Sequence, residues 1–274
     1  MWKFVLALLL GASVAEAVPV EPNIIGVFSK MNMTEEEYQI RMDSAMESGK
    51  WGVSYDVEPE PMKFKFFDSF NRLLMALFVN EADEIILPEV SGEYLLKTLK
   101  NRYMVSGTSR EPSCLAFGFR KSGGQALKES FDKALIEMKE DGTLAALQST
   151  YLTDLETLTT EPVNFKKFED ARTVKIAVTG DLPPIDMVTE NGTPAGFSTA
   201  LLAEIGRRLH LNITLIDIAA GTRATFLGSK KVDAVFWFQL DSGSEIQPDV
   251  PEGVALSEPY YEWSGNLHIR QKQF

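Results

Sequence analysis

The chain has 274 residues, of which 45% are hydrophobic and 24% charged, as in globular proteins that bury a substantial core. Its formal net charge of −12 makes nucleic acid and anionic lipid unsuitable partners, so we predict that it binds neither. The single cysteine, Cys114, excludes a disulfide within the chain and follows a Pro-Ser turn at the start of an apolar run. We expect it to be a buried strand residue.

The first residues have the pattern of a secretory signal peptide. Lys3 precedes an apolar run over residues 4–10, and the small residues Ala15 and Ala17 form an A-x-A cleavage site. The apolar run is too short to span a bilayer, which excludes a membrane anchor of that kind. We therefore expect export to the periplasm with removal of residues 1–17. No cysteine lies near the cleavage site, so we expect no lipid anchor.

The first half of the remaining chain alternates between strand and helix patterns. Thr34 and Glu37 are spaced as a capping box, which predicts that a helix begins there. The segment 108–113 is rich in turn residues, and we interpret it as a connector. Strands are expected at 23–28, 62–67, 83–89 and 103–107, and helices at 68–82 and 91–101. This alternation predicts an α/β fold with a parallel sheet.

A second block of the same kind follows. A strand from Cys114 leads into helices over 123–142 and 143–152, and residues 153–171 have the weak periodicity of a surface linker. An Asn-Gly pair at 191–192 predicts a small hairpin. The apolar run 232–240 predicts a strand buried on both faces. Further strands are expected at 173–179, 212–218 and 264–271, and helices at 198–211 and 221–231. Two similar α/β blocks indicate two lobes.

The stretch 174–218 resembles the opening of the type II periplasmic solute-binding proteins, and specifically the polar amino-acid branch that serves ABC importers, solute-binding protein family 3. The resemblance extends to the strand at 232–240 and to the segment 256–263. The matching positions are Pro183, Pro184, Gly196, Phe197, Leu209, Asp233, Ser257, Pro259, Tyr260 and Tyr261. It implies a two-lobe α/β fold of type II with a ligand cleft between the lobes.

The segments of that fold occur here in rotated order. Residues 24–38 and 70–96 resemble the second lobe, and residues 114–152 resemble the usual C-terminal end, which precedes the usual beginning at 173. We interpret the chain as a circular permutant, which is tolerated where termini lie close together. The alternative is a fragment of two tandem binding proteins that pairs with another copy, but each element occurs once, which favours the permutant. The domains would be residues 22–112 completed by 263–274 for lobe 2, and 113–262, including the linker 153–171, for lobe 1.

The resemblance implies a small polar ligand and the membrane components of an ABC importer as partners, with a monomeric protein. The family's carboxylate-binding Arg has no counterpart between residues 238 and 253, and Pro88 stands where its ammonium-binding Asp would lie. Arg223 is the candidate replacement cation, unless it is a solvated helix residue. The other candidate ligand-binding residues are Asp181, Leu182, Trp237, Phe238, Glu89, Asn32 and Thr34. Trp237 and Phe238 point to opposite strand faces, so one belongs to the core. For Thr34 the alternative is a role as the helix cap alone.

Three functions remain open. The first is a binding protein that captures a solute, amino acid-like or other, for an importer. The second is an enzyme on the same scaffold, which we do not expect, because His210 and His268 lie far apart and no catalytic or metal-ligand spacing is visible. No cofactor or metal is predicted. The third is a degenerate family member that acts as a sensor or protein-interaction module without amino-acid binding.

Overall fold

The computed structural model describes residues 21–49, 52–55, 61–99, 101–153, 163–189, 191–242, 244–245 and 247–272. The predicted signal peptide, residues 1–17, lies outside these residues, as does the stretch 154–162 of the predicted linker. No helix within the described part of the chain has the length and apolar character needed to cross a membrane.

The described strands form one large mixed sheet and a small hairpin. Along the large sheet the order is β3-β1-β4-β12-β5-β10-β6-β9, with β2 and β11 both pairing with β5. The hairpin joins β7 to β8 around the Asn-Gly pair, as the sequence predicts. The strands are β1 (Asn23–Phe28), β2 (Gly52–Tyr55), β3 (Met62–Phe67), β4 (Glu84–Pro88), β5 (Tyr103–Arg120), β6 (Thr173–Val178), β7 (Met187–Val188), β8 (Pro194–Ala195), β9 (Asn212–Asp217), β10 (Ala234–Asp241), β11 (Val254–Leu256) and β12 (Tyr261–Gln271).

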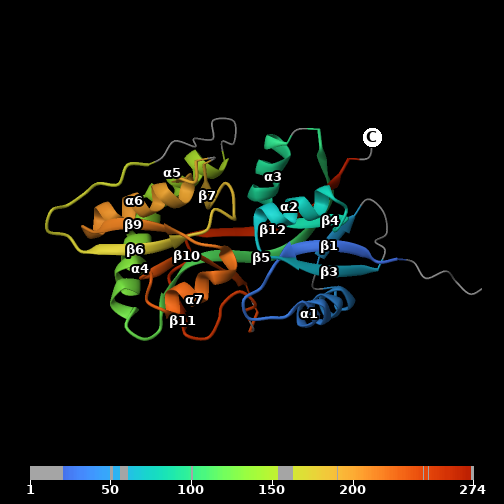
Figure 1. The fold of residues 1–274 in the computed structure, drawn as a ribbon, viewed down its shortest axis with the longest axis horizontal. Helices are drawn as coiled ribbons and strands as arrows, with labels where there is room; N and C mark the ends of the chain where they lie inside the picture. The colour runs from blue at the N-terminus through green and yellow to red at the C-terminus, as the bar shows by residue number, and fades with distance from the viewer. Residues whose placement is uncertain are drawn as a thin grey trace, which may run out of the picture.

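The sheet divides into two halves, which Figure 1 shows side by side. The terminal half contains β1, β3 and β4 with α1 to α3, and the central half contains β6, β9 and β10 with α4 to α7. Within each half these strands pair in parallel. The expectation of a parallel sheet is wrong for the whole, because β5 and β12 run through both halves and pair antiparallel with each other and with their neighbours. Both ends of the described chain therefore lie in the terminal half.

The connector predicted at 108–113 is wrong, because this segment belongs to β5, which continues over 18 residues. Residues 108–110 pair with both β12 and β2, which supply the partners that a turn would lack. The register with β12 shifts between Arg110 and Ser113, so Pro112 lies at a bulge. A bulge is one of the few places in a sheet where proline, which has no N–H group, is tolerated.

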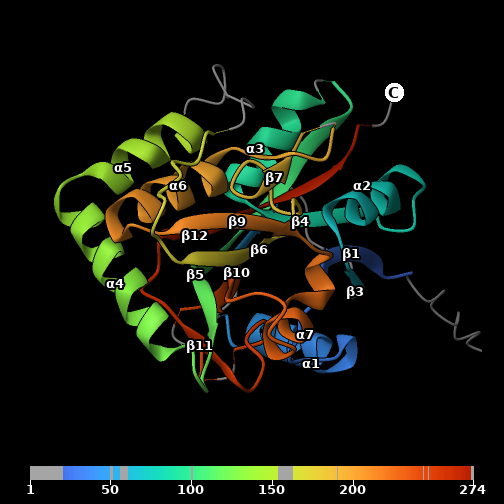
Figure 2. The same cartoon turned by 60° about the vertical axis from the view of Figure 1, so that its left-hand side comes forward.

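The helices follow the predicted pattern with shifted ends. Thr34 and Glu37 form the predicted capping box at the start of α1, with Thr34 N–H donating to Glu37 Oε2 at 2.8 Å. Figure 2 shows α4, α5 and α6 together beside the central half. The helices are α1 (Glu35–Glu47), α2 (Phe70–Phe78), α3 (Glu89–Thr98), α4 (Gln125–Glu140), α5 (Thr143–Gln148), α6 (Phe197–Leu209) and α7 (Arg223–Gly228), with a π-turn at Ser149–Thr153 and a 3-10 turn at Ala220–Thr222.

Each half has its own apolar core. In the central half the ring of Phe117 packs against those of Phe131, Phe236 and Tyr260, and the Tyr260 hydroxyl donates to the carbonyl of Phe236 at 2.8 Å. In the terminal half separate clusters lie against the two faces of β1 and β4. Cys114 lies in β5 as predicted but is only half-buried. Burial raises the pKa of its thiol, which keeps it in the less reactive protonated form.

Candidate functional site

A cavity of about 280 Å³ lies between the two halves of the molecule. The residues that line it come from the ends of β1 and β3 in the terminal half, and from β10 and the 3-10 turn in the central half. Ligands of open α/β sheets bind beyond the carboxyl ends of the strands, which is where the parallel strands of both halves end. The lining residues are Phe28, Ser29, Lys30, Met31, Phe67, Asp68, Ala220, Gly221, Arg223 and Trp237.

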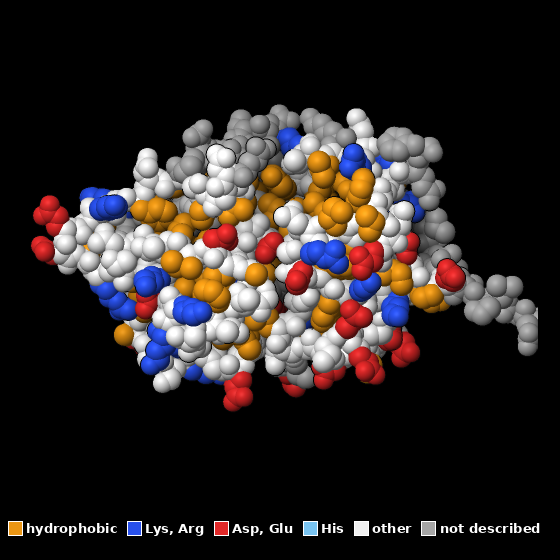
Figure 3. Space-filling view, in the orientation of Figure 1, with side chains coloured by type: hydrophobic (Ala, Val, Ile, Leu, Met, Phe, Trp, Pro, Cys, Tyr) orange, Lys and Arg blue, Asp and Glu red, His pale blue; other side chains and the backbone are white. Residues whose placement is uncertain are grey.

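Two further features continue this cavity. A narrower pocket shares part of its lining and adds Pro88, Leu182, Asp249 and Trp263. The space-filling view in Figure 3 shows a furrow between the halves with acidic side chains near it on both sides. Because both halves contribute side chains to the cavity, a change in their separation would change its size and access.

Arg223 forms the wall of the cavity and is almost fully buried, with 2% of its surface exposed. Its guanidinium group donates to both carboxylate oxygens of Asp249, from Nη1 at 2.9 Å and from Nη2 at 2.7 Å. Nε donates to the carbonyl of Ala220, and Nη1 also donates to that of Trp237. The predicted replacement cation therefore faces the cavity, but its charge is already matched by a bidentate carboxylate.

Trp237 is held by a chain of hydrogen bonds that ends at a buried acid. Its Nε1 donates to Thr179 Oγ1 at 3.1 Å, and Thr179 donates to Asp186 from its amide at 2.8 Å and its hydroxyl at 3.1 Å. Burial raises the pKa of Asp186 to about 6, against the opposing effect of these bonds. The guanidinium carbon of Arg223 lies 3.6 Å from the Trp237 ring centroid, which fixes one face of the indole.

Of the two neighbouring aromatic residues Trp237 and Phe238, Phe238 is the one that belongs to the core. It is fully buried, and its ring lies where a side chain at Gly118 would have to stand.

Leu182 is buried and lines the narrow pocket, while Asp181 lies beside it at the boundary of the two halves. The backbone N–H of Phe70, the first residue of α2, donates to Asp181 Oδ1 at 3.3 Å. Burial raises the pKa of this carboxyl, and Asp217 and Asp68 add to the rise.

The remaining predicted residues lie away from the cavity lining. Glu89 is exposed at the start of α3, close to Gly265 of β12, and its charge adds to the burial that raises the pKa of Tyr261 to about 12. Thr34 caps α1. Asn32 is exposed, and its backbone N–H crosses to the central half to donate to the carbonyl of Pro248 at 2.7 Å. Of the predicted set, the structure brings together Leu182, Arg223 and Trp237.

Several lining residues have no counterpart in the sequence-based prediction. Phe28 ends β1, Ser29 and Lys30 follow it, and Asp68 directly follows β3. The signal that could have found them was available, because polar residues that follow parallel strands gather at one edge of a sheet. Nothing in the sequence alone pairs the end of β1 with the distant segment 220–223.

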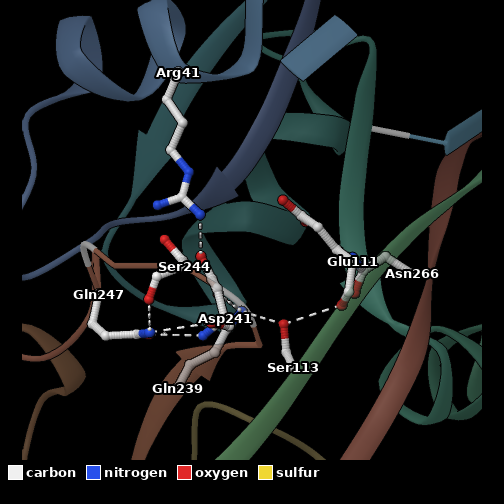
Figure 4. Close-up of polar contacts among 8 residues, drawn as sticks. All are labelled: Arg41, Glu111, Ser113, Gln239, Asp241, Ser244, Gln247 and Asn266. Carbon is white, nitrogen blue, oxygen red and sulfur yellow. Dashed lines mark hydrogen bonds and ion pairs between the residues drawn. The ribbon is translucent and has the colours of Figure 1, made fainter. Parts of the chain in front are cut away.

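A second contact region joins the halves beside a wider groove of about 790 Å³. Arg41 of α1 donates from Nη2 to Asp241 Oδ2, at the end of β10, at 2.8 Å. Figure 4 shows this pair within a polar network that reaches β5 and β12. Gln239 donates to Asp241 and, at 3.4 Å, to Ser113, and Asn266 donates to Glu111 at 3.2 Å.

Glu111 lies at the β5 bulge, where the long strand passes between the halves. Burial raises the pKa of its carboxyl and the charge of Asp241 raises it further, whereas Lys30 and Arg41 act in the opposite direction. The network therefore links α1 of the terminal half to the strands about which the halves would move.

Among the described residues, no group of three or more His, Cys, Asp or Glu side chains is placed to hold a metal ion. His210 ends α6 beside Phe168, while His268 is buried on β12 with Nδ1 3.8 Å from Glu84. Neither histidine lines the cavity between the halves.

Comparison with known proteins gives one family match. Residues 174–273, which are 100 of the 274 residues, match the model of the bacterial extracellular solute-binding proteins, family 3. This part of the chain holds Leu182, Arg223 and Trp237 as well as β12, and it is similar to that family. A comparison with curated proteins finds no match.

Several solved structures are similar to the chain at low identity. A pheromone cOB1 precursor/lipoprotein of Enterococcus faecalis has a TM-score of 0.46 and 10% identity, with 92% of this chain and 86% of that chain covered. The ligand-binding component of an ABC-type import system from Staphylococcus aureus has a TM-score of 0.45 and 8% identity, with 92% of this chain and 66% of that chain covered. A putative L-cystine ABC transporter from Listeria monocytogenes has a TM-score of 0.40 and 10% identity, with 93% of this chain and 84% of that chain covered. The chain spans slightly less than two thirds of the Staphylococcus protein.

Proposed function

We propose that the protein is an exported solute-binding protein, in which the two halves are lobes that close on a small polar molecule and deliver it to an ABC importer. The observation that carries this proposal is the cavity of about 280 Å³ lined by both halves, with charged and aromatic side chains facing one space. The family match over residues 174–273 supports the same function. The protein would bind its solute without turning it over.

The proposal includes the arrangement of the chain. Residues 22–112 with 263–274 would form lobe 2, and residues 113–262 would form lobe 1 with the linker 153–171. The path of β5 and β12, each passing through both halves, supports a hinge made of two strands. Circular permutation of the family fold accounts for both chain ends lying in one half. Export through a cleaved signal peptide at residues 1–17, without a lipid anchor, completes the proposal, with a monomer as the working form.

The test is thermal unfolding of the protein against amino acids, amines, organic acids and sugars. A ligand at about 100 times its Kd adds roughly 2.7 kcal/mol to the free energy of unfolding. In a chain of this size each 1 kcal/mol raises the Tm by about 2–4 °C, so the total rise is roughly 5–10 °C. A saturable rise for one class of solute supports capture. A flat panel, together with unchanged intrinsic tryptophan fluorescence, would contradict it.

One observation favours the alternative of a sensor or interaction module. Arg223 and Asp249 already satisfy each other, so the cavity wall needs no ligand to balance its charge. In that case a partner protein, rather than a solute, would stabilise the closed arrangement. Failure of the solute panel together with stabilisation by a purified importer membrane component would support the alternative.

A further inference from the structure

The groups at the cleft that could bind an anion already hold carboxylates of the protein itself. Asp249 accepts from both terminal nitrogens of Arg223, at 2.9 and 2.7 Å. Asp181 accepts from the first N–H of α2, where the helix dipole favours a negative charge. A ligand carboxylate would have to displace one of these partners, and the first of the two pairs is almost completely buried.

Lys30 is the other cation in the cavity lining, and its ammonium group has neighbours outside the cavity. Nζ lies 5.9 Å from the ring centroid of Tyr38, on the side of α1. The charge of Lys30 also opposes the rise in the pKa of Glu111. Its ammonium group therefore has an aromatic neighbour on α1 that does not line the cavity.

The lining of the cavity also combines aromatic rings with a carboxylate. Phe28, Phe67 and Trp237 come from three different strands, and Asp68 follows Phe67 directly. Asp68 and Asp217 both raise the pKa of Asp181, so three carboxyl groups share this region. Aromatic faces attract cations through their quadrupoles, and a nearby carboxylate strengthens that attraction. The net charge of −12 adds a long-range field that concentrates cations near the protein.

We propose that the cleft selects a compact organic cation, a quaternary ammonium or alkylamine compound, held by Asp68 and by the aromatic side chains of Phe28 and Trp237. This inference rests on the proposed function and names the solute class for the same cavity. The cavity of about 280 Å³ limits the ligand to a small molecule. No carboxylate on the ligand is needed for recognition, in contrast to an α-amino acid.

The test is isothermal titration calorimetry of the purified protein with matched solutes. Tetramethylammonium, choline and butylammonium are the cationic probes, and acetate, succinate, L-glutamine and glucose are the anionic, zwitterionic and neutral ones. Saturable heat with the cations alone is the expected result. The affinity for choline should fall with added salt, because the attraction to Asp68 is screened.

Variants of cavity residues test whether choline binds in this cavity. Asp68 is exposed, so Asp68→Asn should leave folding unchanged and weaken choline binding by about tenfold or more. Asp170→Asn is the matched control, because Asp170 is an exposed carboxylate outside the cavity lining and its loss changes the net charge equally. Phe28→Leu removes the ring but keeps most of the apolar volume, and should weaken choline binding by about threefold to tenfold.

The outcomes separate this inference from the proposed function. Binding of L-glutamine, succinate or glucose in place of the cations would overturn the cation assignment and leave solute capture standing. Equal loss of choline affinity in Asp68→Asn and Asp170→Asn would also overturn it, because only the overall charge would then matter. No saturable heat with any probe would overturn both.

Discussion

Two arginine–aspartate pairs with similar bond lengths occupy very different regions of the molecule. Arg223 and Asp249 lie within the central half at 2.7 Å, with 3% and 5% of their side-chain surfaces exposed. Arg41 and Asp241 join the two halves at 2.8 Å, with 27% and 15% exposed. The buried pair fixes the wall of the cavity, because breaking it leaves a buried charge without a partner or water. The more exposed pair can open and close at little cost.

The largest expected effect is on the buried pair. Asp249→Ala leaves the Arg223 guanidinium buried without its carboxylate, and should lower the free energy of unfolding by about 3–5 kcal/mol. Urea denaturation followed by circular dichroism measures this loss. The double variant Arg223→Met/Asp249→Ala removes both charges and should recover part of the stability. A loss below about 1 kcal/mol in the single variant would show that the pair is not a closed buried unit.

Asp186, which supports the same wall through Thr179 and Trp237, should make stability depend on pH. Its pKa rises from 3.8 to about 6 on folding, so its stabilising contribution is complete below pH 3.8 and is lost as the pH rises through 6. Wild type should therefore lose about 3 kcal/mol relative to Asp186→Asn between pH 4 and pH 7. The measurement is urea denaturation of both proteins across this range. If the free energy of unfolding of the two proteins depended on pH in the same way, the raised pKa of Asp186 would be contradicted.

A smaller effect is expected at the start of α1, the helix that carries Arg41. Thr34→Ala removes the side-chain acceptor of the capping box and should cost about 1 kcal/mol. Thr98→Ala, in the last turn of α3, is a control that removes no capping acceptor and should change stability by about 0.5 kcal/mol or less. Equal losses in the two variants, measured by thermal unfolding, would show that the capping box is not what holds α1.

The smallest effect on stability is expected for the pair that joins the halves. Arg41→Gln should change the free energy of unfolding by less than about 1 kcal/mol, because the pair is partly solvated. The same variant should favour separation of the halves, which small-angle X-ray scattering would detect as a larger radius of gyration. Lys133→Gln, which breaks an exposed pair within α4, is the control and should leave the radius unchanged. A change in stability without a change in radius would argue against a role in closure.

The contrast between local and distant contacts also explains which parts of the structure are predictable from sequence. The capping box at Thr34 and the buried strand β10 depend on residues close together in the chain, and both predictions are confirmed. The strand character of 108–113 depends on pairing with β12, whose residues are about 150 positions away, and local turn propensity gave the wrong result.

The same limit applies to the site. Arg223 and Trp237 could be proposed from their place in the second block, but the partner that neutralises Arg223 could not, because Asp249 lies in an irregular segment. Arg41 and Asp241 are 200 positions apart, and no periodicity connects them. Phe28 and Asp68 end strands in the other half, so their convergence on Trp237 requires the three-dimensional arrangement of both halves.

The most direct test of the account is the distance between the two halves with and without bound solute. Spin labels at Glu47, at the end of α1, and Lys231, which follows α7, report on it in a variant with Cys114→Ser, because both positions are exposed. Double electron–electron resonance should show that any solute bound in calorimetry narrows the distance distribution and shifts it to shorter values. An unchanged distribution with a saturating solute would contradict capture by closure of the two halves.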